Sequence, residues 1–110
     1  MIDVIIIGAG VIGALTAREL AKYQLKVLVV DKENDVGNET TMANSAIVHS
    51  GYDPLPGTLK ARFNVAGNAM FDELAEDLDF HFGRVGSLTL ALSEEQIPVL
   101  LNLRKQARLN

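Results

Sequence analysis

The sequence contains no cysteine, and this absence excludes several kinds of chemistry. Disulfide bonds, zinc–thiolate sites and catalytic thiols all require cysteine side chains, so this chain cannot form them. Histidine is also scarce. Two histidines give no basis for a histidine metal site, and we predict no bound metal.

An excess of positive charge is missing as well. Ten Lys and Arg residues stand against fourteen Asp and Glu residues, the net charge is −4, and no basic patch stands out. We therefore expect no nucleic-acid partner. No apolar run is long enough to span a bilayer, and residues 1–3 lack the basic character that begins a signal peptide. The expected location is cytoplasmic.

The chain does contain an ordered succession of local signals in residues 1–31. Residues 4–7, Val-Ile-Ile-Ile, form a β-branched run without a polar break, which is typical of a parallel strand covered on both faces. A helix is expected from about residue 11 to residue 22, followed by a second apolar strand at 27–30. These signals together predict a βαβ unit.

The turn between the first strand and the helix has the spacing G-x-G-x-x-G, with glycines at Gly8, Gly10 and Gly13. The first allows a tight turn, the second lets the backbone approach phosphates, and the third lets the helix pack against the strand. Such a helix start attracts a pyrophosphate through its unpaired N–H groups and its dipole.

Asp31 ends the second strand, 18 residues after Gly13, near the spacing expected for an acid that accepts hydrogen bonds from a ribose. An acid at this place also disfavours a 2′-phosphate, because two anions would repel each other. The pattern predicts a site for the ADP half of a dinucleotide. The alternative is a glycine turn in an α/β protein that binds nothing.

Two strands do not complete a dinucleotide domain, and no third buried β run follows Asp31. We therefore expect an incomplete domain, the N-terminal piece of a longer protein. The alternative is a complete small protein that pairs with another chain. Exposed sheet edges would favour self-association of a truncated domain.

Three further elements are expected downstream. Thr58 is expected to cap a helix that runs to about Leu78. Residues 84–92 alternate like a strand, and residues 98–110 repeat apolar positions at helical spacing, with Ser93 and Gln96 as a capping box before them. The expected buried stripe of the helix after Thr58 is Phe63, Ala66, Met70, Leu74 and Leu78.

Three stretches resemble a known family. They are DVIIIGAGVIGALTARELAKY at 3–23, VLVVDKENDVG at 27–37, and residues 40–100, which contain the more specific ANSAIVHSGYDPLPGTLKA. The chain is similar to FAD-dependent oxidoreductases of the D-amino-acid oxidase type, and among them to flavin-linked glycerol-3-phosphate dehydrogenases and L-2-hydroxyglutarate oxidases. The resemblance covers almost the whole chain.

The resemblance implies an α/β flavoprotein with a Rossmann-like FAD-binding βαβ unit followed by the start of an α+β substrate domain. Residues 1–80 would belong to the FAD-binding domain and residues 81–110 to the substrate domain. The implied reaction is hydride transfer to the flavin from a small hydroxy acid, glycerol 3-phosphate or an amine. This chain alone would be inactive, because the rest of the flavin site is missing from it.

The resemblance also implies roles for individual residues. The three glycines and the amides of Val11 and Ile12 would line the FAD pyrophosphate. Asp31 would hold the adenosine ribose, and Lys32 would lie near the adenine. Residues 40–49 would follow the phosphate and ribityl chain toward the flavin. The contact candidates in that segment are Thr40, Thr41, Asn44 and Ser45, with His49 as the candidate catalytic residue.

Purely structural roles are the alternatives to these functional ones. His49 could be a neutral core histidine, and Thr40 and Thr41 could satisfy loop backbone. Ala46 stands where the family pattern has glycine, so a positive φ there would be unfavourable. Two other functions are kept as alternatives: a stand-alone nucleotide-binding or interaction module without catalysis, and an NAD-dependent dehydrogenase.

Overall fold

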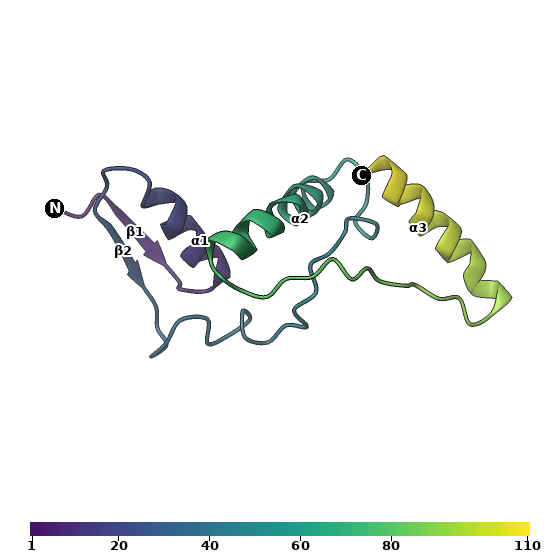
Figure 1. Cartoon of the computed structure of the whole chain (residues 1–110), viewed down its shortest axis with the longest axis horizontal. Coiled ribbons are helices and arrows are strands. Elements are labelled where there is room, and N and C mark those ends of the chain that lie inside the picture. The colour runs from purple at the N-terminus through teal and green to yellow at the C-terminus, as the bar shows by residue number, and fades with distance from the viewer. The chain divides into compact units, whose positions relative to one another are not determined.

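The computed structural model describes residues 1–110, which form two compact units, residues 1–47 and residues 48–110. The first unit contains β1 (Val4–Ile7), α1 (Val11–Leu20) and β2 (Val27–Val30). The second contains α2 (Leu59–Asp77), the 3₁₀ turn η1 (Glu94–Gln96) and α3 (Ile97–Leu109) (Figure 1). None of the helices has the length and apolar character needed to cross a membrane.

The first unit is the βαβ unit that the sequence predicts. β1 and β2 pair in parallel, with Val4 opposite Val27 and Ile7 opposite Val30. The amide of Gly8 then donates a hydrogen bond to the carbonyl oxygen of Val30 at 2.7 Å. Both strands therefore end at the same level, and the glycine turn into α1 starts at this edge of the sheet.

Two glycines make the turn and the helix packing possible. Gly8 has a φ of +106°, in the left-handed region that favours glycine. A Cβ on Gly13 would lie 1.9 Å from the carbonyl oxygen of Gly8 and 3.3 Å from Cγ2 of Ile6. The tight turn and the close packing of α1 on β1, both predicted from the glycine spacing, are confirmed.

In the second unit, α2 begins where the sequence predicts. The side-chain oxygen of Thr58 accepts a hydrogen bond from the amide of Ala61 at 3.2 Å and so caps the helix. The predicted buried stripe is wrong. Phe63 is 61% exposed, and Ala66, Met70 and Leu78 are exposed too, while Ala61 is the buried residue of the helix. Helical periodicity identifies residues that share a face, but burial requires a segment that covers that face.

The strand predicted at residues 84–92 is also wrong. The segment pairs with no other strand, and Val85 in it is 93% exposed. Alternating apolar residues make a strand only when a neighbour supplies hydrogen-bond partners. α3 follows as predicted, but Ser93 forms no side-chain cap. Instead, Oε1 of Gln96 accepts a hydrogen bond from the amide of Leu92 at 2.8 Å.

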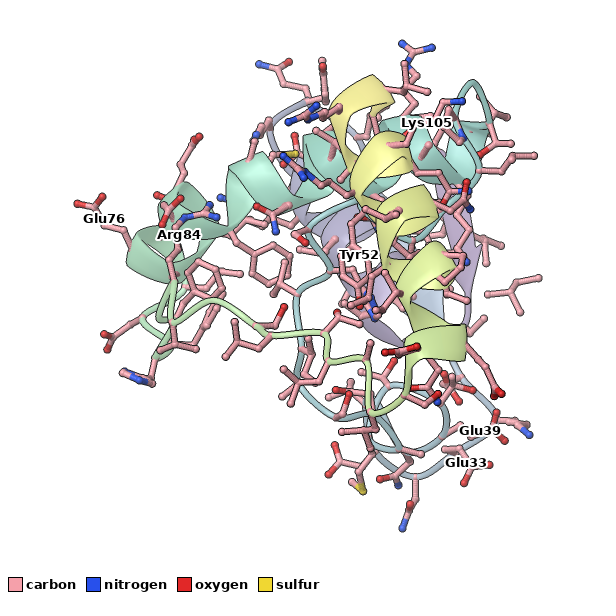
Figure 2. The ribbon with its side chains drawn as sticks, turned by 90° about the vertical axis from the view of Figure 1, so that its right-hand side faces the viewer. Glu33, Glu39, Tyr52, Glu76, Arg84 and Lys105 are labelled. Carbon is pink, nitrogen blue, oxygen red and sulfur yellow. The ribbon has the colours of Figure 1, made fainter.

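The units have very little interior. Ala9 and Ala61 are the buried apolar residues, while Ile7 at the end of β1 is 87% exposed. Side chains project widely from the ribbon (Figure 2). A two-stranded parallel sheet leaves both edges unpaired, and parallel sheets are normally covered on both faces. This exposure agrees with the expectation that two strands do not complete a dinucleotide domain.

Candidate functional site

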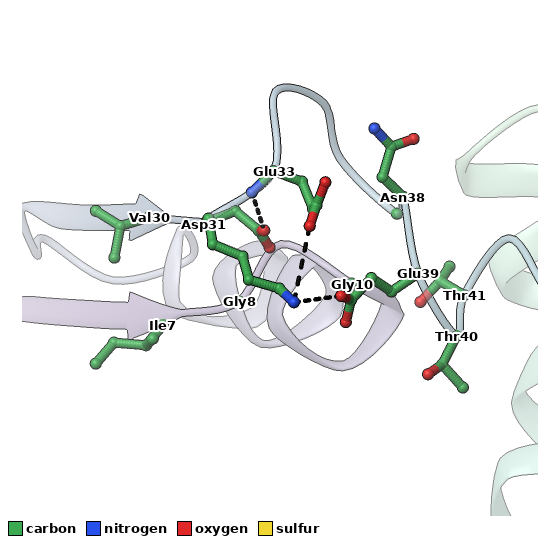
Figure 3. Close-up of a pocket in the computed structure, with 12 residues that line it drawn as sticks. Ile7, Gly8, Gly10, Val30, Asp31, Glu33, Asn38, Glu39, Thr40 and Thr41 are labelled. Atoms are coloured by element: carbon green, nitrogen blue, oxygen red, sulfur yellow. Dashed lines mark hydrogen bonds and ion pairs between the residues drawn. The ribbon is translucent and has the colours of Figure 1, made fainter.

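A pocket of about 530 Å³ lies in the first unit, where β1 and β2 end and α1 begins (Figure 3). In open α/β sheets, ligands bind at the carboxyl ends of the strands, which is the edge that carries this pocket. Its walls come from the two strand ends, the glycine turn and the loop that follows β2. The lining residues are Ile7, Gly8, Gly10, Val30, Asp31, Lys32, Glu33, Gly37, Asn38, Glu39, Thr40 and Thr41.

The carboxylate of Asp31 lies beside the glycine turn. Its Oδ2 accepts a hydrogen bond from the amide of Ala9 at 2.5 Å, and its Oδ1 accepts one from the amide of Glu33 at 2.9 Å. These two amides, Ala9 first, lower the pKa of Asp31 below its usual range. The group is therefore ionised, and a carboxylate has about four acceptor positions, so these two amides leave acceptor capacity free.

The start of α1 is open to an anion except for one contact. Gly10 precedes the helix and offers no side-chain cap. The amide of Val11 instead donates a hydrogen bond to Oγ1 of Thr41 at 2.9 Å, from 30 residues further along the chain. A Cβ on Gly10 would lie 3.0 Å from the same oxygen. Because Oγ1 accepts the Val11 hydrogen, its own hydrogen is available to a phosphate oxygen.

Lys32 brings a positive charge to the pocket wall. Its Nζ forms an ion pair with the carboxylate of Glu39 and lies 3.7 Å from that of Glu33 (Figure 3). The hydrogen bond with Glu39 is the main cause that raises the pKa of Lys32. All three side chains are exposed, so these ion pairs contribute little stability and can open to a ligand.

The remaining candidates of the first unit divide between wall and loop. Thr40 lines the pocket. The predicted contact residues that do not line it are Val11, Ile12, Gly13, Asn44 and Ser45. Asn44 shapes the loop instead: its Nδ2 donates to the carbonyl oxygen of Thr41, and its Oδ1 accepts from the amide of Ala46 at 2.6 Å. Ser45 is exposed.

Ala46 has a φ of +53°. The methyl group therefore stands at a left-handed position, where a side chain is unfavourable.

His49 belongs to the second unit and is exposed. Its carbonyl oxygen accepts a hydrogen bond from Nδ2 of Asn68 at 3.0 Å. Its catalytic role stays a prediction, as do the ligand contacts of the residues in the first unit.

Sequence reasoning missed six lining residues: the strand ends Ile7 and Val30, and Glu33, Gly37, Asn38 and Glu39 of the loop after β2. Gly37 has a φ of +73°, and its amide donates to the carbonyl oxygen of Ala9 at 3.1 Å, which draws the loop onto the glycine turn. The signals that could have found the loop residues are a glycine within a polar loop and the opposite charges of Lys32 and Glu39.

The strand–glycine turn–helix–strand arrangement, with an ionised acid beside the turn, defines a dinucleotide-binding unit. A family model described as "FAD dependent oxidoreductase" (DAO) matches residues 3–110. The chain belongs to this family of FAD-dependent oxidoreductases. The predicted family is thereby confirmed, and so is the prediction of FAD over a nicotinamide cofactor.

Individual relatives agree with this assignment. The chain is 58% identical to a glycerol 3-phosphate dehydrogenase of Caloramator mitchellensis, over 96% of this chain and 22% of the relative. It is 33% identical to a mitochondrial L-2-hydroxyglutarate dehydrogenase of Arabidopsis thaliana, over 99% of this chain and 23% of the relative. The chain therefore spans less than a quarter of the length of these two relatives.

A solved structure is similar as well. The dithionite-reduced L-α-glycerophosphate oxidase of Mycoplasma pneumoniae, which has FAD bound, matches with a TM-score of 0.84 and 34% identity. The match covers 96% of this chain and 28% of that structure.

Proposed function

We propose that this chain forms the ADP-binding start of a flavoenzyme that oxidises glycerol 3-phosphate. The observation that carries the proposal is the carboxylate of Asp31, held 2.5 Å from the amide of Ala9 beside the start of α1. The substrate is supported by the relatives named glycerol 3-phosphate dehydrogenase and oxidase. We further propose that residues 81–110 begin the substrate domain.

The residues of the pocket fit the ADP half of FAD. Asp31 would accept hydrogen bonds from the ribose hydroxyls through its free acceptor positions. The hydroxyl of Thr41, which the amide of Val11 holds in place, and the dipole of α1 would hold the pyrophosphate. Gly10 would let the backbone come close to it. FAD supplies the hydride acceptor when it is bound.

His49 is proposed to lie near the flavin or the substrate. A neutral imidazole can accept the proton that a hydroxyl group releases when its carbon loses a hydride. The second candidate substrate is L-2-hydroxyglutarate, which the name of the relative from Arabidopsis thaliana supports.

The FAD site is tested with a chimera in which this chain replaces the matching 106 residues of the Caloramator mitchellensis dehydrogenase. We expect a yellow protein with flavin absorbance. Asp31→Asn should lower its FAD content, whereas Asp35→Asn is the matched control, because Asp35 is an exposed acid of the same loop that does not line the pocket. A folded, colourless chimera that binds ADP would favour the stand-alone nucleotide-binding module.

The substrate is tested with the natural protein that carries this sequence. Under anaerobic conditions, glycerol 3-phosphate should bleach the flavin absorbance, and L-2-hydroxyglutarate should bleach it more slowly. Bleaching by L-2-hydroxyglutarate alone would replace the first candidate substrate with the second. An enzyme that depends on added NAD would contradict the proposal.

A further inference from the structure

We infer that Asn68 and Arg84 are positioning residues that hold the backbone of His49 in place. The inference rests on the proposed function only for the role of His49, because the contacts themselves lie within the second unit. The contacts join three segments that are distant in sequence: the loop at residue 49, the middle of α2, and the loop after α2.

The first contact fixes a carbonyl group. Nδ2 of Asn68 donates a hydrogen bond to the carbonyl oxygen of His49 at 3.0 Å, across 19 residues of sequence. Asn68 lies in the middle of α2, on the same face as Asp72, which follows four residues later. A helix interior is a rigid base, so this bond ties the loop at residue 49 to a fixed part of the unit.

The second contact determines which way the Asn68 amide points. Nη1 of Arg84 donates to Oδ1 of Asn68 at 2.9 Å, and Nη2 donates to the carbonyl oxygen of Asn68 at 3.0 Å. A guanidinium group can only donate, so the amide must turn its oxygen toward Arg84. Its NH₂ group then faces His49. Arg84 therefore acts on His49 through Asn68.

Arg84 is itself held firmly on α2. Its Nε lies 3.0 Å and 2.9 Å from the two carboxylate oxygens of Asp72, and its Nη2 donates to the same carboxylate. The guanidinium carbon lies 5.3 Å from the centre of the Phe82 ring, and Phe82 contacts Phe71 of α2 at 5.4 Å between ring centres. Figure 2 shows Arg84 beside the part of α2 that carries Glu76. The pairing of the Arg84 guanidinium with the Asp72 carboxylate through two nitrogen atoms requires arginine, because lysine has only one nitrogen to donate.

The segment that begins at His49 is also held further along. A Cβ on Gly51, whose φ is +91°, would lie 2.5 Å from Cγ2 of Val65 on α2. Nδ2 of Asn110 donates to the carbonyl oxygens of Gly51 and Pro54, both at 2.8 Å. The side chains of Asn68 and Asn110 therefore both hold the backbone of residues 49–54. The bond from Asn68 fixes the backbone at His49 and so the position from which the His49 side chain projects.

Hydrogen exchange in the chimera tests this hold. Asn68→Asp keeps the shape and the acceptor for Arg84 but removes the donor to His49. We expect amide exchange in the peptide spanning residues 48–54 to become about fivefold faster, as for the loss of one ordinary hydrogen bond. Asn102→Asp on α3 is the matched control and should leave exchange of this peptide unchanged. Far-ultraviolet circular dichroism checks that α2 remains folded.

A double substitution tests whether Arg84 acts through Asn68. Arg84→Ala alone should also accelerate exchange, but adding it to Asn68→Asp should give nearly no further change. Independent effects would multiply to about 25-fold for two fivefold effects, and that result would overturn the inference, as would unchanged exchange in Asn68→Asp.

The catalytic rate separates this inference from the proposed function. In the natural protein, Asn68→Asp should lower kcat for glycerol 3-phosphate while KM and the FAD content stay as in the parent. Faster exchange with an unchanged kcat would support the hold on the His49 backbone and would contradict the proposed role of His49.

Discussion

Gly13 offers the sharpest test of how the fold builds the pocket. In Gly13→Ala, the new Cβ would lie 1.9 Å from the carbonyl oxygen of Gly8, 3.1 Å from its carbonyl carbon and 3.3 Å from Cγ2 of Ile6. Two of these three atoms belong to the backbone of the glycine turn, which cannot rotate away as a side chain could. The helix must therefore move off the strand.

The size of the effect follows from that geometry. α1 must retreat by about 1 Å before Cβ and the oxygen stand 3.0 Å apart, the lower limit that real Cβ contacts respect. Overpacking of this kind costs about 1–3 kcal/mol. Because Gly10, which precedes the helix, lines the pocket, the same free energy lost from binding would make FAD binding about 5- to 150-fold weaker.

Titration of the apo-chimera with FAD, followed by quenching of flavin fluorescence, measures this loss. Gly67→Ala is the matched control, because a Cβ there meets nothing within 4 Å. That change should leave FAD affinity unchanged and stabilise α2 by up to about 1 kcal/mol. If Gly13→Ala binds FAD as tightly as the parent and melts at the same temperature, the close packing of α1 on β1 does not support the pocket.

Three other substitutions test separate features. Amide hydrogen bonds, that of Ala9 first, lower the pKa of Asp31 in the folded chain below the ordinary value of 3.8. The ionised carboxylate therefore stabilises the fold fully above pH 3.8, and this stabilisation is lost as the pH falls through the lowered pKa. Melting curves of the chimera and its Asp31→Asn variant should differ by a constant amount from pH 7 to about pH 5 and converge progressively at lower pH; convergence near neutrality would refute this. Thr41→Val removes the acceptor for the amide of Val11 and should weaken FAD binding about fivefold, while Thr41→Ser should not. Ala46→Gly should raise the free energy of unfolding by up to about 1 kcal/mol, because glycine tolerates the φ of +53°. A lower melting temperature would contradict this.

The first unit could be predicted because its signals are local. The β-branched run of β1, the glycine spacing and Asp31 at the end of β2 each depend on short stretches of sequence. The family resemblance added FAD, which the spacing alone did not distinguish from a nicotinamide dinucleotide. The resemblance also indicated that a positive φ at Ala46 would be unfavourable, and the φ of Ala46 is +53°.

The errors concern contacts between distant segments. Residues 84–92 have the alternation of a strand, but a strand also needs a partner, which no local pattern reveals. The bond between Thr41 and Val11 joins residues 30 apart in sequence, with α1 and β2 between them, so no periodicity could indicate it. Likewise, the face of α2 with Phe63 and Met70 could be identified, but its exposure depends on which other segments lie over it.

The hydrogen bond between Ala9 and Asp31 connects the glycine turn with the end of β2. A ribose hydroxyl that donates to the Asp31 carboxylate changes the strength of its hydrogen bond with the Ala9 amide. A diphosphate that shifts the glycine turn changes the position of the same amide and so the electrostatic environment of the carboxylate. The binding of adenosine and the binding of pyrophosphate, as separate molecules, should therefore be coupled. By thermodynamic linkage, each would change the affinity of the other by the same factor.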